Sequence, residues 1–131
     1  MMKVRYFFLT LFILMTFVFK QSFAMEMEDY DIAVLGALNK VTGKNSVIKS
    51  EVGEKIKFGD LEIKVFACQK SSPLEAPESA SFLRIKNKDR LEFSGWMYAS
   101  SPALSAMESG VYDIWVVDCE KNTCKNGKDC L

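Results

Sequence analysis

The chain has 131 residues, 49% of them hydrophobic, with 17 basic and 17 acidic residues, so its formal net charge at pH 7 is zero. This length suits one domain that is large enough to bury a core. The sequence contains no histidine, which excludes Ser-His-Asp and Cys-His catalysis, histidine metal ligands and histidine-based pH sensing.

The first 24 residues have the three parts of a secretory signal peptide. Two cations precede an apolar run over residues 6–19, and the small residues Ser22 and Ala24 provide a cleavage site. The run is shorter than the roughly 20 apolar residues of a permanent membrane span. We therefore predict a signal peptide over residues 1–24 and a secreted, periplasmic protein that begins near Met25. A signal segment that stays uncleaved and anchors the protein to the membrane is the alternative.

Removal of this segment changes the charge of the protein. Lys3, Arg5 and Lys20 would leave, so that residues 25–131 keep 14 basic residues against 17 acidic ones, a net charge of −3. An acidic domain lacks the electrostatic attraction to phosphates on which nucleic-acid binding depends. We therefore expect no nucleic-acid partner.

The remaining chain alternates apolar and polar residues over short stretches that are separated by turn residues, as antiparallel strands do. Residues 25–31 are acidic and are predicted to form no element. The apolar stretch at 32–38 is followed by a Gly-Lys-Asn turn, which fits a hairpin better than a helix over 31–40. Strands are predicted over residues 32–38, 46–52, 55–58, 61–68, 81–86, 91–98 and 111–119, the last of them central in its sheet.

The same alternation predicts which side chains are buried. In the stretch 61–68, the apolar residues Leu61, Ile63, Val65 and Ala67 share the buried face. In the stretch 91–98, one face carries Leu91, Phe93, Gly95 and Met97, and the other carries Trp96 and Tyr98.

A short helix is predicted after these strands. Ser101 and Pro102 are typical of a helix start, and one or two helical turns over residues 103–108 would end at Gly110. No repeat or linker divides residues 25–131, so we expect one domain with a short cysteine-containing tail. The predicted fold class is all-β: a small antiparallel β-sandwich or barrel with one short helix, preceded by the signal-peptide helix.

All four cysteines, Cys68, Cys119, Cys124 and Cys130, lie in the part that is predicted to be exported. In an oxidising compartment an even number of cysteines predicts disulfides, and four cysteines allow three connectivities. We favour Cys68–Cys119, at the ends of two apolar strands, together with Cys124–Cys130, which bracket an Asn-Gly turn. A zinc site made of the four thiolates is the alternative, but structural zinc sites show closer cysteine pairs. We predict no metal and no other cofactor.

Two groups of polar residues resemble catalytic sites. Ser100 and Ser101 lack both the Gly-x-Ser-x-Gly elbow and a histidine base. Glu108, Asp113 and Asp118 could supply the paired carboxylates of a glycoside hydrolase. Since a partly buried carboxylate such as Asp113 is more often paired with a nearby amide than catalytic, we predict no catalytic residue.

Four aromatic residues follow one another closely: Trp96, Tyr98, Tyr112 and Trp115. Aromatic side chains usually pack in the core of so small a domain, but alternation places Trp96 and Tyr98 opposite the predicted core face. Exposed aromatic side chains mark contact surfaces. The candidate binding residues are therefore Trp96, Tyr98, Tyr112, Asp113 and Trp115.

A long part of the sequence resembles a known family. The distinctive stretches are FSGWMYASSPALSA at 93–106 and VYDIWVVDC at 111–119, with fitting segments at 33–44, 58–63 and 67–68. Together they resemble an uncharacterised family of secreted proteins, found mainly in Alphaproteobacteria and catalogued as domain of unknown function 2155.

This resemblance extends over residues 32–119, nearly the whole predicted domain, and begins only after the predicted cleavage site. It implies no activity, because the family has no established one. It supports Cys68 and Cys119 as a pair, since both lie in the matching region, whereas Cys124 and Cys130 lie beyond it.

We accordingly predict a non-enzymatic binding or accessory protein of the bacterial cell envelope, with an envelope protein or a cell-wall glycan as its partner. The alternative is a carboxylate-based hydrolase acting on an envelope glycan, in which Asp113 would work with Glu108 or Asp118. Two carboxylates in one open cleft would favour the hydrolase, and an aromatic surface would favour binding.

Overall fold

The computed structural model describes residues 1–17 and 24–123, in which one helix is followed by eight β-strands and a 3₁₀ turn. Cys124 and Cys130 lie outside the described residues, and so does the disulfide predicted between them. The elements are α1 (Met2–Phe17), β1 (Met27–Tyr30), β2 (Ile32–Asn39), β3 (Lys44–Glu51), β4 (Lys55–Phe58), β5 (Leu61–Ser71), β6 (Ser79–Asn87), β7 (Arg90–Tyr98), η1 (Pro102–Ser105) and β8 (Tyr112–Glu120).

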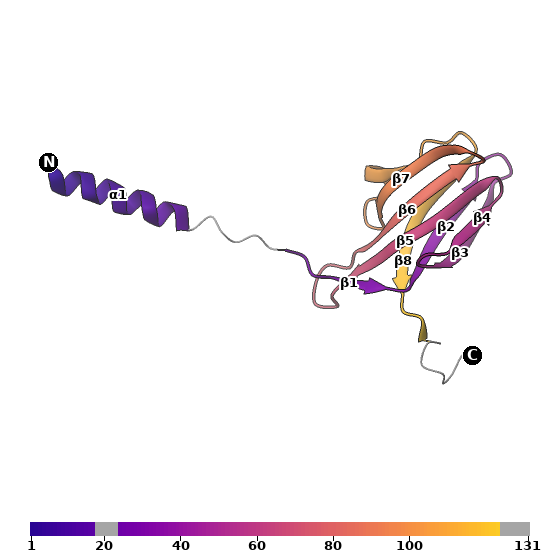
Figure 1. The fold of residues 1–131 in the computed structure, drawn as a ribbon, viewed down its shortest axis with the longest axis horizontal. Coiled ribbons are helices and arrows are strands. Elements are labelled where there is room, and N and C mark those ends of the chain that lie inside the picture. Colours follow the sequence, from indigo (N-terminus) through magenta and orange to yellow (C-terminus); the bar gives the residue numbers. More distant parts are fainter. Residues whose placement is uncertain (18–23, 124–131) are drawn as a thin grey trace.

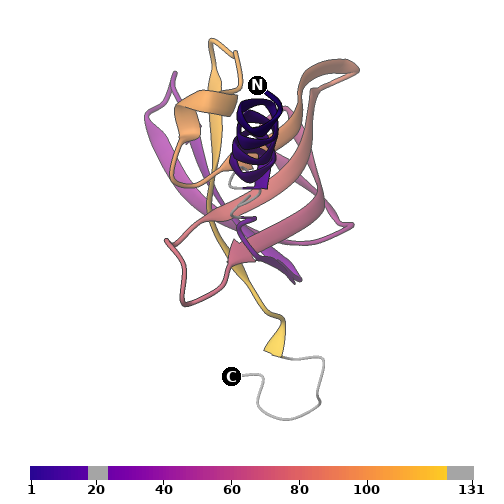
Figure 2. The ribbon, with the colours of Figure 1, turned by 90° about the vertical axis from the view of Figure 1, so that its left-hand side faces the viewer.

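The strands form two antiparallel sheets that pack face to face. The larger sheet has the order β1-β5-β6-β7, and β4 pairs with β5 beside β1; the smaller sheet has the order β3-β2-β8. Figures 1 and 2 show the two sheets as two layers. The all-β prediction is therefore confirmed, and of the two architectures considered it is the sandwich that the described residues form.

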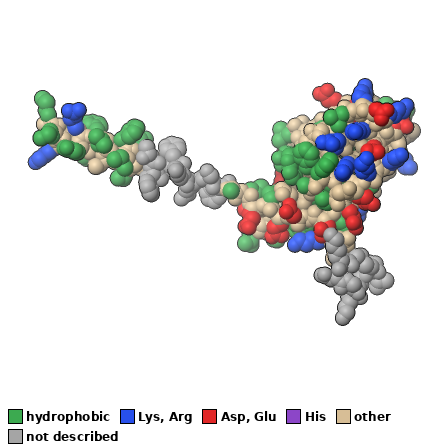
Figure 3. Space-filling view, viewed as in Figure 1, with side chains coloured by type: hydrophobic (Ala, Val, Ile, Leu, Met, Phe, Trp, Pro, Cys, Tyr) green, Lys and Arg blue, Asp and Glu red, His purple; other side chains and the backbone are tan. Residues whose placement is uncertain are grey.

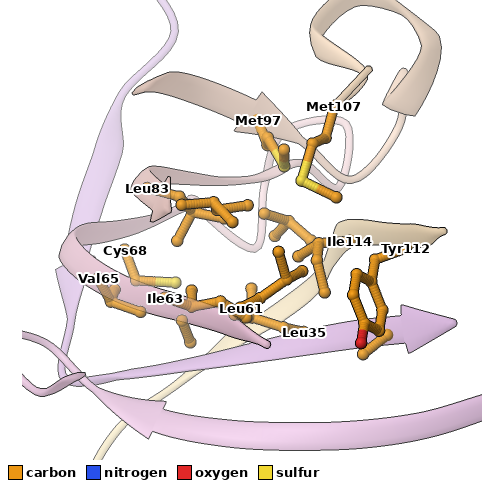
Figure 4. Packing of buried hydrophobic residues seen from close by; sticks show 14 of the residues in the cluster. Leu35, Leu61, Ile63, Val65, Cys68, Leu83, Met97, Met107, Tyr112 and Ile114 are labelled. Carbon is orange, nitrogen blue, oxygen red and sulfur yellow. The ribbon is translucent and has the colours of Figure 1, made fainter. Parts of the chain in front are cut away.

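The core lies between the two layers. Both sheets contribute side chains that are almost completely buried, among them Leu35, Ile63, Leu83 and Ile114 (Figure 4). Figure 4 also shows Met97 and Met107 side by side at one end of this cluster. Burying one such aliphatic side chain stabilises a fold by about 1.5–3 kcal/mol, so these inward rows are the main source of stability.

An irregularity in each sheet changes which side chains point inward. In the larger sheet Val65 pairs with Leu83 and Ala67 with Phe82, so Phe66 is an extra residue on β5. After this bulge the next fully buried side chain is Cys68, whereas Ala67 is only half-buried. The prediction that Ala67 belongs to the buried face is therefore wrong, because alternation does not anticipate a β-bulge.

A matching irregularity occurs in the smaller sheet. There Val34 pairs with Asp118 and Leu35 with Val116, which leaves Val117 as the extra residue on β8. Beyond it Cys119 points inward and is 1% exposed. Strict alternation from Tyr112 would have turned this cysteine outward.

The two bulges together allow the disulfide between the sheets. Cys68 of β5 and Cys119 of β8 are bonded, with their Cα atoms 5.8 Å apart. The bridge favoured from the sequence is thus present, and it closes a loop of 51 residues across the sandwich. A four-thiolate zinc site is incompatible with it.

Two predictions about the arrangement of strands are wrong. The strand predicted as central, β8, lies at the edge of the smaller sheet, whose order is β3-β2-β8. Leu91 was predicted on the core face of β7, but Ile85 pairs with Phe93 and Lys86 with Leu91, so a bulge at Glu92 turns Leu91 outward, where it is 54% exposed.

Two predictions about the elements themselves are also wrong. Residues Met27–Tyr30, for which no element was predicted, form β1 and pair with the end of β5. The predicted helix over 103–108 is a single 3₁₀ turn, Pro102–Ser105, after which Ala106 is extended. Proline begins this turn as predicted, but the Ser101 side chain makes no capping hydrogen bond, and the chain must straighten so that Met107 can enter the core.

The N-terminal helix α1 carries exposed apolar side chains and lies apart from the sheets in Figure 1. It has 16 residues, and among the described residues no helix is long and apolar enough to span a membrane. A signal peptide over residues 1–24 stays a prediction.

Candidate functional site

The structure distributes the five candidate binding residues over three places. Trp96 and Tyr98 project from the outer face of the larger sheet, and Asp113 and Trp115 from the outer face of the smaller sheet. Tyr112 lies in the core, where it is 6% exposed. The aromatic residues that are close in the sequence therefore do not form one surface.

Tyr112 holds a turn of the larger sheet in place. Its hydroxyl accepts a hydrogen bond from the Asp60 amide at 3.3 Å, and its ring packs edge-on against Phe58 at 5.9 Å. It also lies close to Gly59, whose φ of 57° is in the left-handed region that favours glycine. The sequence signal for this role is the Gly-Asp turn between β4 and β5.

Trp115 lies against a glycine of the neighbouring strand. Gly36 of β2 is its cross-strand partner, and a β-carbon at position 36 would collide with the indole ring. One side of the indole therefore covers the backbone of β2, and the other side is turned away from the sheet. A glycine inside a strand is a known sign of such close approach, and here it is the signal that the sequence reasoning missed.

Beside Trp115 the surface has a shallow pocket of about 340 Å³. Its other walls come from the segment after β7, where Pro102, Ala103 and Ala106 face β8, and Asp113 contributes the one carboxylate. Ligand pockets are typically apolar, with few polar groups and volumes of about 300–1,000 Å³. We call this site, lined by Pro102, Ala103, Ala106, Asp113, Ile114 and Trp115, the Trp115 pocket.

The carboxylates considered for hydrolysis are not brought together as a set. Asp113 is on the outer face of the smaller sheet, whereas Asp118, beyond the position of the bulge, turns to the larger sheet and accepts hydrogen bonds from Ser79 (3.0 Å) and Lys70 (2.8 Å). Five residues of strand separate them by about 16 Å, more than the 5–9.5 Å or so between glycosidase carboxylates. The hydrolase alternative therefore rests on Asp113 with the exposed Glu108.

Asp118 is an ion-pair partner between the sheets. Partial burial raises the pKa of its carboxyl, but the hydrogen bond from Lys70, the Cys119 amide and the Ser79 hydroxyl outweigh this effect and hold the pKa below its ordinary value. The same hydrogen bond raises the pKa of Lys70. Asp118 is thus charged and engaged in a structural contact.

Ser100 is held by Glu78, which comes just before β6. Its hydroxyl and its amide both donate to the Glu78 carboxylate, the amide at 3.1 Å. Burial raises the pKa of Glu78, but these bonds and those from the Ser79 and Ala99 amides hold it below its ordinary value. Ser100 therefore anchors the segment after β7 to Glu78. The residues that follow it in this segment, from Pro102 on, form one wall of the Trp115 pocket.

The outer face of the larger sheet carries a second apolar region. Phe66, Phe82 and Trp96 form a row across β5, β6 and β7, with ring centroids 5.8 and 5.7 Å apart. Next to it a groove of about 270 Å³ is lined mainly by Met25, Met27, Gln69, Ala80, Trp96 and Tyr98. Figure 3 shows hydrophobic side chains gathered on this side of the domain, with Lys and Arg side chains beside them.

No group of three or more His, Cys, Asp or Glu side chains is arranged to hold a metal ion in the part of the chain that the structure describes. The chemistry that the described residues offer is that of contact surfaces: an aromatic pocket on one sheet and an aromatic, charged face on the other. These features define a disulfide-linked β-sandwich with two separate candidate binding faces.

Comparison with known proteins places this sandwich in a family. Residues 33–119 match the family described as "Uncharacterized protein conserved in bacteria (DUF2155)", and the chain belongs to it. It is similar to an uncharacterized protein of Rickettsia prowazekii (strain Madrid E), with 32% identity over 104 residues that cover 74% of this chain and 66% of that relative. The chain thus spans just under two thirds of the relative's length. No solved structure matches the chain.

Proposed function

We propose that this protein is a non-enzymatic binding protein of the bacterial cell envelope and that the Trp115 pocket binds a sugar unit of an envelope glycan. The observation that carries the proposal is the position of Trp115. Its indole lies against Gly36, and Trp115 lines a shallow pocket that contains one carboxylate.

This arrangement matches the chemistry of a sugar ring. A pyranose presents C–H groups on its faces, which pack against the electron-rich face of an aromatic ring, and hydroxyl groups at its edge, which donate to a carboxylate. Asp113 lies on the same face as Trp115, two residues away along β8. The contact with Gly36 fixes the indole before the ligand arrives, which lowers the entropic cost of binding.

An envelope location is part of the proposal. The two cations and the apolar helix at the N-terminus are the features of an export signal, and the Cys68–Cys119 disulfide suits an oxidising compartment. N-terminal sequencing of the protein from its own cells tests the location: a chain that begins near Met25 supports export with cleavage, and a chain that begins at Met1 or Met2 contradicts cleavage.

Tryptophan fluorescence tests the binding site directly, because the chain has only two tryptophans. In the Trp96→Phe variant, Trp115 is the remaining one. We expect its emission to change saturably when soluble peptidoglycan fragments or other envelope oligosaccharides are added. The matched control is Trp115→Phe, in which Trp96 reports alone and should not respond; the absence of any saturable response with all these saccharides would contradict the proposal.

The Asp113→Asn variant separates binding from hydrolysis. An amide still forms hydrogen bonds with sugar hydroxyls, so we expect the dissociation constant to change by less than about tenfold. A hydrolase would instead need the carboxylate itself. Release of reducing ends by the wild-type protein, lost in Asp113→Asn with unchanged folding, would establish the enzyme and reject the binding protein.

A further inference from the structure

The outer face of the larger sheet is organised around its row of aromatic side chains. Phe82 of β6 lies at the centre, between Phe66 of β5 and Trp96 of β7. Phe66 is 38% exposed and Tyr98 37% exposed, although both belong to a sheet whose inner face is fully packed. Apolar side chains that are exposed together in this way are typical of a contact surface.

Charges of opposite sign lie on the two sides of this row, toward opposite ends of the strands. Toward one end are the carboxylates of Asp29, which accepts a hydrogen bond from Gln69 at 2.8 Å, and of Glu78, which lines the groove. Toward the other end a cluster of cations, Lys55, Lys64, Arg84 and Lys86, surrounds Glu62. Lys55 bonds Glu62 at 3.1 Å, and Lys64 and Arg84 lie 4.9 and 5.1 Å from the Phe66 ring.

The positions of these charges are symmetric about the aromatic row. Along β6, Glu78 precedes Phe82 by four residues and Lys86 follows it by four, which is about 13 Å in each direction. On the far side of β5 from β6, β1 and β4 pair with opposite ends of β5, so that Asp29 is beside Gln69 and Lys55 is beside Lys64. If a second copy of the sheet is laid on the first with its strands running in the opposite direction, each acidic position therefore meets a basic one.

We propose that this face pairs with the same face of a second copy of this chain. The two-fold axis would lie in the interface between the larger sheets of the two copies. It would run across the strands, perpendicular to β6 and level with Phe82. It places Phe82 opposite Phe82, Glu78 of each copy opposite Lys86 of the other, and Asp29 of each opposite Lys55 of the other. Such a self-complementary patch is what an isologous dimer requires.

The size of the face sets the expected strength. Four tracks of strand and nine residues of length make a face of about 20 by 30 Å, so that the dimer would bury roughly 1,200 Å² from both partners together, at the lower end for specific interfaces. Interfaces of this size include weak, reversible complexes, so we look for the dimer at micromolar protein concentrations. The Trp115 pockets lie on the other sheets, so each dimer presents two of them outward, and the inference does not depend on what those pockets bind.

Sedimentation velocity of the purified protein across the micromolar range, with charge-swapped variants, tests this arrangement. We expect a monomer–dimer equilibrium for the wild type. Asp29→Lys and Lys55→Glu should each weaken it by at least about tenfold, because each places like charges opposite one another. Mixing the two variants should restore dimers, since both contacts between positions 29 and 55 in the heterodimer join opposite charges. One contact is the native pair, and in the other the two charges have changed places.

Lys49→Glu is the matched control, because it reverses the charge of a side chain that is 58% exposed on the smaller sheet and should leave the equilibrium unchanged. A wild type that stays monomeric throughout would overturn the proposal. Association that persists unchanged in both charge variants would overturn it as well, since the contact would then come from another surface.

Discussion

The two sheets resemble each other on their inner faces and differ on their outer ones. Inside, both present rows of aliphatic side chains that are joined by one disulfide. Outside, the larger sheet carries three aromatic rings on β5, β6 and β7 with charges of opposite sign on either side of them. The smaller sheet carries one indole, that of Trp115, packed against one glycine. The first pattern suits a broad contact with another protein surface, and the second suits a single small ring.

The largest effect is expected where the two sheets are joined. Replacing both Cys68 and Cys119 by alanine removes a bridge that closes a 51-residue loop, which costs about 4 kcal/mol by chain-entropy arithmetic. Urea unfolding of the double variant against the wild type measures this difference. A loss below about 1 kcal/mol would mean that the packing of the two inner faces suffices to hold the sheets together.

Truncation of one leucine on each face compares how much the inner and outer faces of the larger sheet contribute to stability. Leu83 of β6 is 0% exposed and Leu91 of β7 is 54% exposed. We expect Leu83→Ala to lower the free energy of unfolding by about 3 kcal/mol, because it leaves a cavity, and Leu91→Ala to change it by less than about 0.5 kcal/mol. Equal losses in chemical denaturation would contradict this difference between the inner and outer faces of the sheet.

Two glycines compare the outer face of the smaller sheet with the inner face of the larger one, because Gly36 is opposite Trp115 and Gly95 is opposite the buried Leu83. A β-carbon at Gly36 collides with Trp115, whereas at Gly95 of β7 its nearest neighbour is the Phe93 ring at an ordinary 3.5 Å. Gly36→Ala should therefore cost about 2 kcal/mol by overpacking and displace the indole, and Gly95→Ala should be neutral or stabilise by up to about 1 kcal/mol.

Unfolding curves and the emission maximum of Trp115, in a Trp96→Phe background, check both glycine variants. An unchanged Trp115 environment in Gly36→Ala would contradict the close approach of the indole to β2. It would also remove the structural basis for the Trp115 pocket.

The smallest effect is expected at the rim where the sheets meet. The pKa of Asp118 is lowered on folding, so the stability that it contributes is present above its unfolded pKa of about 4 and is lost as the pH falls through its folded pKa. Because its side chain is 39% exposed, we expect this contribution to stay below about 1 kcal/mol.

Unfolding free energies measured between neutral and acidic pH test the role of Asp118. The Asp118→Asn variant should lose less stability over the acidic range than the wild type does. Glu78→Gln serves as the comparison, since the pKa of Glu78 is also lowered on folding. An acid dependence of Asp118→Asn identical to that of the wild type would show that the contact with Lys70 and Ser79 contributes nothing.

Most strands could be predicted because their information is local. Alternation and turn residues located seven of the eight strands to within a few residues. β1 was missed because its stability comes from pairing with the end of β5 and not from its own acidic sequence. The helix was overestimated because the burial of Met107, a long-range contact, overrides the local helix signal after Pro102.

The candidate sites were predictable only in part. Trp96 and Tyr98 were assigned to the outer face by alternation, and the structure places them there. Tyr112 was grouped with them, but it lies on the core face of β8. The sequence did not indicate the pocket walls, because Pro102 and Ala106 meet Trp115 only when the segment after β7 crosses from one sheet to the other.

The sequence by itself determined the all-β class, most strand positions and the absence of histidine chemistry, and it favoured Cys68 and Cys119 as a pair among three possible connectivities. Each of these follows from residue types and short-range periodicity. The tertiary structure decided which way those two cysteines point. Strict alternation turns both of them outward, and a bulge at Phe66 and another at Val117 turn them inward. A bulge is a property of two paired strands, so it becomes visible only when the sheets have formed.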